Sequence, residues 1–167
     1  LANESYLASQ LTEELVERCR SVEGPLAIPE LEADGDLDGL PAAEVDLAEA
    51  CEVLDGWDGV YDLDRSGPPL FSEFVGRFAS GDLRDAGSLW AEAFDPARPV
   101  ETPTGLAPGL GPNEDGVDPI LVNLARAVQT LEAAEIPVDA TLGEVQFTMR
   151  NDLRIPIHGG GEAVGVT

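Results

Sequence analysis

The sequence contains no lysine, and all nine of its basic residues are arginines. Against them stand 33 acidic residues, so the formal net charge is −24. A field of that sign repels phosphates and anionic headgroups, which excludes nucleic acid and membranes as partners of this surface. Acidity with so little lysine fits a salt-adapted protein or one from a GC-rich genome, and either origin concerns solvation and does not indicate a chemistry.

The sequence also lacks any apolar run long enough to cross a bilayer and any signal-peptide pattern. Its hydrophobic content is 43%, which argues against disorder, and 167 residues allow one domain with a core of its own. Because the chain starts at Leu1 in a polar helical pattern, we expect processing or truncation upstream.

Cysteine is scarce as well: Cys19 and Cys51 are the only two. Two cysteines cannot build a disulfide scaffold, and these lack the spacing of zinc ligands. Each falls on a predicted helix. They are therefore either two buried thiols or one disulfide that joins the two helices.

Apolar periodicity predicts four helices. The first covers 3–21, the second begins at Asp46 with a capping box to Glu49 and ends at Gly56, and the third covers 69–80. The fourth covers 119–135, with Asp118 as its N-cap and Pro119 in its first turn. Residues 23–44 and 95–118 are rich in proline and glycine and are predicted loops.

After Pro137 the pattern changes from helical to alternating. A strand is predicted over 144–149, a second over 154–157, and 163–166 is a candidate third strand. The predicted fold class is α+β. It divides into a helical part over 1–94, a loop over 95–118, a helix over 119–135 and strands over 141–167.

One acidic loop has the oxygen-ligand spacing of an EF-hand. Asp62, Asp64, Ser66 and Glu73 occupy its positions one, three, five and twelve, with Gly67 at position six. Pro68 and Pro69 interrupt the loop, and Gly56 and Gly59 break the entering helix that an EF-hand needs. A calcium site is the weaker interpretation; the other is a solvated turn in which Asp62 or Asp64 caps the third helix.

The only histidine, His158, stands between Ile157 and the glycine run 159–161. It lacks a nucleophile motif such as a strand–turn–helix serine elbow, which favours a structural role over a catalytic one. The glycines lack both a βαβ context and a lysine to contact a phosphate, so nucleotide binding is not expected.

Several stretches together resemble one family, the penicillin amidase-type acylases. They are 6–19, 46–54, 57–64 with Leu70 and Phe71, and above all 142–146 followed by 154–160. This last pair is similar to sequence late in the large chain of the aculeacin A and acyl-homoserine lactone acylases. The pieces occur in the family's order along nearly the whole chain.

The resemblance implies a segment of an αββα N-terminal nucleophile hydrolase. Such enzymes are exported proenzymes whose self-cleavage exposes a serine, and that serine attacks an amide carbonyl with its own α-amino group as base. Because Leu1 is not a serine, we expect no catalytic residue and no cofactor in this chain. Its terminal strands would join the core sheet.

Expected partners are other segments of the acylase, one of them with an N-terminal serine, and an acylated β-lactam, lipopeptide or homoserine lactone. The expected location is extracellular or periplasmic, which favours the disulfide between Cys19 and Cys51. The alternative is a freestanding acidic binding module that holds calcium at 62–73.

Overall fold

A computed structural model describes residues 3–32, 39–78, 82–83, 85–108 and 117–161. The first helix, α1 (Tyr6–Arg20), begins after Ser5, whose hydroxyl accepts a hydrogen bond from the Ala8 backbone N–H at 3.1 Å. Leu11, Leu15 and Cys19 are buried along one face, as the spacing of four predicts.

Helix α2 (Ala48–Asp55) begins two residues later than predicted. Its N-cap is Leu47, not Asp46, and Leu47 makes no side-chain cap, so the predicted capping box is wrong. The Asp46 carboxylate instead accepts a hydrogen bond from the Ala48 N–H at 2.9 Å. The helix ends before Gly56, as predicted.

Helix α3 (Gly67–Gly76) begins two residues before the predicted start. Its N-cap is Ser66, so the prediction that Asp62 or Asp64 caps this helix is wrong. Pro68 and Pro69 fit the first turn because the N–H groups they lack would have no partner inside the helix.

Helix α4 (Pro119–Ala133) confirms the predicted start and ends two residues before the predicted end at 135. Asp118 is its N-cap and accepts a hydrogen bond from the Ile120 N–H at 2.9 Å, with proline at the first position. Leu124 and Val128 belong to its buried face, and α4 packs against α3.

Two antiparallel hairpins lie in stretches predicted to be helical or loop. Strand β1 (Leu26–Ile28) pairs with β2 (Ala43–Val45), and β3 (Trp90–Glu92) pairs with β4 (Thr104–Leu106). Each strand has three residues, which is too few for an alternating pattern to emerge from the sequence.

The end of the described chain forms α5 (Leu142–Val145), β5 (Phe147–Arg150) and β6 (Leu153–Pro156). The strand predicted from 144 therefore begins only at Phe147. Thr141 and Glu144 form a capping box that holds the preceding turn in a helix. Strands β5 and β6 pair antiparallel across Asn151 and Asp152, both with positive φ. Strand β6 begins and ends one residue before the second strand predicted over 154–157. The candidate strand 163–166 lies outside the described residues.

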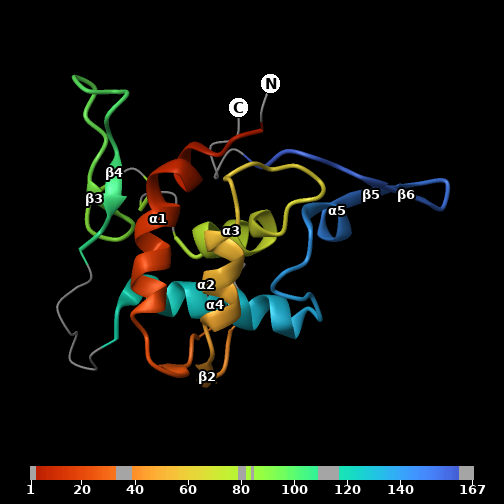
Figure 1. Cartoon of the computed structure of the whole chain (residues 1–167), viewed down its shortest axis with the longest axis horizontal. Helices are drawn as coiled ribbons and strands as arrows, with labels where there is room; N and C mark the ends of the chain where they lie inside the picture. Colours follow the sequence, from red (N-terminus) through yellow and green to blue (C-terminus); the bar gives the residue numbers. More distant parts are fainter. Residues whose placement is uncertain (1–2, 33–38, 79–81, 84, 109–116, 162–167) are drawn as a thin grey trace.

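The helices and the first two hairpins share one apolar core, whereas the β5–β6 hairpin extends away from them (Figure 1). The buried core cluster ends at Leu142, just before the hairpin, among the residues described. The mixture of helices and small antiparallel sheets confirms the α+β class. Within the described ranges, no helix is both long and apolar enough to span a membrane.

Candidate functional site

The four residues with EF-hand spacing point to different partners. Asp62 Oδ1 accepts a hydrogen bond from Asn3 Nδ2 at 2.9 Å, and Asp64 lies 3.4 Å from Arg65. Ser66 occupies the N-cap position of α3 without a side-chain capping bond, and Glu73, on α3, lies 3.5 Å from Arg77. Over the described part of the chain, no group of three or more His, Cys, Asp or Glu residues is arranged to hold a metal.

Gly67, the glycine at the sixth position of that pattern, is required by packing. A Cβ at this position would overlap the side chain of Trp57, so only glycine lets α3 begin against the indole. Trp57 in turn packs on Tyr61 and Phe71, with ring centroids 5.5 and 5.3 Å away. The glycine thus belongs to the start of a helix rather than to a calcium loop, and the geometry does not favour the calcium hypothesis.

His158 lies at a junction of three chain segments. Its Nδ1 is 3.3 Å from Asn3 Nδ2, and the same amide nitrogen donates to Asp62. Beside it, the Gly159 N–H donates to the Tyr61 carbonyl at 3.0 Å. An amide between an imidazole and a carboxylate connects segments and supplies no nucleophile, which agrees with the structural role predicted for His158.

Tyr61 forms the buried side of this junction. Its hydroxyl lies 3.0 Å from Ser72 Oγ, and its backbone N–H donates to the Asn3 carbonyl at 2.8 Å. Burial raises the pKa of the Tyr61 hydroxyl far above its ordinary value, although the bond to Ser72 opposes the shift. Tyr61 is therefore a packing residue that connects this junction to α3 and to the start of the chain.

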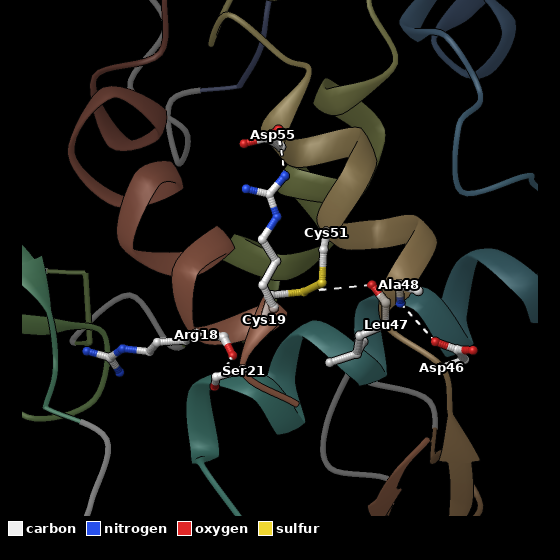
Figure 2. Close-up of a disulfide and its surroundings, with 9 residues drawn as sticks. Arg18, Cys19, Ser21, Asp46, Leu47, Ala48, Cys51 and Asp55 are labelled. Atoms are coloured by element: carbon white, nitrogen blue, oxygen red, sulfur yellow. Dashed lines mark hydrogen bonds and ion pairs between the residues drawn. A yellow bond between two sulfur atoms is a disulfide. The ribbon is translucent and has the colours of Figure 1, made fainter. Parts of the chain in front are cut away.

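Cys19 and Cys51 form a disulfide between α1 and α2 (Figure 2), with Cα atoms 5.8 Å apart. Of the two alternatives that the sequence left open, the structure has the disulfide. Both cysteines are buried, and Arg20 and Asp55 form an ion pair at 2.7 Å across the same two helices. The bond therefore fastens the first two helices of the core.

The two motif pieces after Thr141 meet in space. The Gln146 side-chain amide donates to the carbonyls of Ile157 and Gly159, both at 2.9 Å. The N–H groups of Leu142 and Gly143 donate to the carbonyls of Arg65 and Leu63, both at 2.9 Å. The bonds of Gln146 thus join the two motif pieces at the base of the β5–β6 hairpin, a role that the sequence did not reveal. The bonds of Leu142 and Gly143 attach this base to residues 63–65.

The β5–β6 hairpin is exposed on both faces. Its apolar side chains Phe147, Met149 and Leu153 have exposed fractions of 43, 58 and 64%, and Ile157 beside them is 43% exposed. Arg154 lies over the Phe147 ring, 3.9 Å from its centroid, and donates to the Glu144 carbonyl. Exposed apolar side chains on both faces of a two-stranded ribbon are typical of an element that packs against another one.

Comparison with known proteins assigns the chain to one family. The family model for penicillin amidase matches residues 1–167. The acyl-homoserine lactone acylase PvdQ of Pseudomonas syringae pv. syringae is 30% identical over 165 residues, which are 98% of this chain and 18% of that protein. The aculeacin-A acylase of Actinoplanes utahensis is 36% identical over 123 residues, 72% of this chain and 13% of that protein. The chain thus spans less than a fifth of the length of these relatives.

Proposed function

Because the chain belongs to the penicillin amidase family, we propose that it is one segment of a larger acylase that hydrolyses the amide bond of an acylated substrate. The observation that carries this proposal is the extent of the match: the family model covers all of the chain, but the chain covers only 18% of the PvdQ relative. The segment works as scaffold, and a serine nucleophile in other polypeptide of the enzyme performs the chemistry.

The contacts of the segment support a scaffold role. Its one histidine lies beside the Asn3 amide, the three acidic residues of the EF-hand-like pattern have separate partners, and Gln146 closes the base of the β5–β6 hairpin. The exposed apolar side chains of the β5–β6 hairpin suit pairing with the αββα core, which would bury them and satisfy the strand edges. In this way the hairpin connects the helical body, which consists of α1–α4 and β1–β4, to the catalytic part of the enzyme.

The substrate class is an acyl chain on an amide, as in a β-lactam, a lipopeptide or an acyl-homoserine lactone. Two relatives are named for such substrates, an acyl-homoserine lactone and aculeacin A. An extracellular or periplasmic location fits the disulfide between Cys19 and Cys51, because such bonds persist in oxidising compartments.

The test is to express the complete gene that contains this segment and to purify the mature enzyme. We expect the segment to copurify with a chain whose N-terminal residue is serine, and the assembly to release the acyl group from acyl-homoserine lactones or lipopeptides. Replacing that serine by alanine should abolish hydrolysis while leaving the assembly intact. Hydrolysis by residues 1–167 alone would refute the scaffold role.

A further inference from the structure

A groove runs along the helical body between β1 and the first two turns of α4. Its volume is about 590 Å³. Its walls are mostly apolar, with one cation, and the lining residues are Ala27, Ile28, Pro29, Val117, Pro119, Val122, Asn123 and Arg126. An apolar groove with a single charged group selects an occupant that carries the opposite charge.

Arg126 is the unusual member of this lining. Its Nε atom is buried without a hydrogen-bond partner, and its side chain has no carboxylate partner among the residues that the structure describes. The other arginines that the structure describes outside the β5–β6 hairpin each have a carboxylate within 3.5 Å; they are Arg18, Arg20, Arg65, Arg77 and Arg98. In so acidic a chain, a half-buried arginine without a carboxylate needs an explanation.

The surroundings of Arg126 destabilise the charged form of its side chain. Burial, and secondarily the positive charge of Arg77, lower the pKa of the Arg126 guanidinium from its ordinary value. Arg77 extends toward α4 and donates to the Thr130 hydroxyl, one turn beyond Arg126. Arg77 is itself paired with Glu73, which leaves Arg126 as the guanidinium beside the apolar wall that an incoming carboxylate would neutralise.

We propose that this groove receives an acidic side chain, flanked by apolar ones, from a part of the acylase outside residues 1–167, and that Arg126 pairs with its carboxylate. The inference rests on the proposed function, because it requires a larger enzyme around this segment. A protein segment suits the groove because apolar side chains can pack on Ile28, Val117 and Val122 while the carboxylate reaches the guanidinium.

The absence of lysine makes a direct test available. In the complete enzyme carrying Arg126→Lys, the new amine is the only lysine side chain of this segment. A carbodiimide joins an amine to a carboxylate in direct contact, with loss of water to the reagent. Peptide mass spectrometry of the treated enzyme should show residue 126 joined to an Asp or Glu outside residues 1–167.

The matched control is Arg20→Lys in the same enzyme. Arg20 is more than half exposed and lies 2.7 Å from Asp55, so its cross-link should stay within the segment. The proposal is overturned if residue 126 joins only carboxylates of residues 1–167, joins a second copy of this chain, or joins nothing in the assembled enzyme.

A second measurement does not depend on the lysine variant. Reversing the charge with Arg126→Glu should lower the thermal midpoint of the complete enzyme by several degrees more than Arg20→Glu does. Equal shifts would overturn the proposal. Acylase activity, measured on the same preparations, separates the two proposals: an active enzyme without the cross-link refutes the groove alone, and an inactive wild-type enzyme refutes the proposed function.

Discussion

The helical body and the β5–β6 hairpin meet the same requirement, burial of apolar side chains, in opposite ways. The body encloses Leu11, Phe74 and Leu124 completely, within a core that α1–α4 and the two short hairpins share. The β5–β6 hairpin leaves Met149 and Leu153 largely in solvent and depends on polar contacts at its base. The body therefore stabilises itself, whereas the proposed function has another part of the enzyme cover the hairpin.

Two phenylalanines provide the sharpest contrast between the regions. Replacing Phe74, fully buried on α3, with alanine should destabilise the chain by about 3–5 kcal/mol because it leaves a cavity in the core. Replacing Phe147, 43% exposed on β5, should cost about 1 kcal/mol or less, mainly the contact with Arg154. Urea unfolding of the two variants measures both values, and equal losses would erase the distinction between the regions.

The disulfide should stabilise the body and not the hairpin. Its cysteines are 32 residues apart, so in the chain-entropy model replacing both with alanine should cost about 3–4 kcal/mol. Amide exchange should quicken in α1 and α2, whereas amides of β5 and β6 should keep their rates. Faster exchange in the hairpin alone would contradict this assignment.

Two glycines of α3 test how tightly the body is packed. Gly67→Ala would place a Cβ inside the Trp57 side chain and should cost about 1–3 kcal/mol through overpacking. Gly76→Ala, at the other end of the same helix, meets no atom within 4 Å and should be neutral or slightly stabilising. Thermal melts of both variants suffice; a neutral Gly67→Ala would mean that α3 does not start against the indole.

The smallest effect is expected at the connection between the two regions. The Thr141 backbone N–H, and then its hydroxyl, donate to Glu144 and lower the pKa of that carboxylate below its ordinary 4.5. Because the pKa of Glu144 is lower in the folded chain, its hydrogen bonds to Thr141 stabilise the fold fully above about pH 4.5, and this stabilisation is lost as the pH falls through the folded pKa. Glu144→Gln should lack this part of the acid dependence. The free energy of unfolding of both proteins, measured above and below pH 4.5, gives the size of this stabilisation. Identical pH profiles of the two proteins would exclude it.

Much of the helical body could be predicted from the sequence because neighbouring residues along the chain determine where its helices begin and which face is buried. Helix α4 has an apolar face, an Asp N-cap and a proline in sequence, and the structure confirmed all three. The three-residue strands were missed because their pairing partners are distant along the chain. The predicted strand over 144–149 began too early because the alternation through Val145 concealed the capping box between Thr141 and Glu144.

The site was less accessible to sequence reasoning, since its contacts join remote segments. Neither the bond between Asn3 and Asp62 nor the bond from Gln146 to Gly159 leaves a periodic signal. The spacing of Asp62, Asp64, Ser66 and Glu73 suggested calcium, because four oxygen ligands arise readily in an acidic chain. Because α3 starts at Gly67, the residues with calcium-loop spacing do not form a calcium loop, and this start is not evident from the spacing itself.

Oxidation of Met149 measures whether the rest of the acylase covers the β5–β6 hairpin. It is the only methionine in the chain, and it is 58% exposed on β5. Peroxide should convert it to the sulfoxide quickly when the complete acylase is unfolded in urea, and much more slowly when the enzyme is assembled and the rest of the protein covers the hairpin. Equal oxidation rates in the assembled and unfolded enzyme would show that the hairpin stays in solvent and would contradict the account.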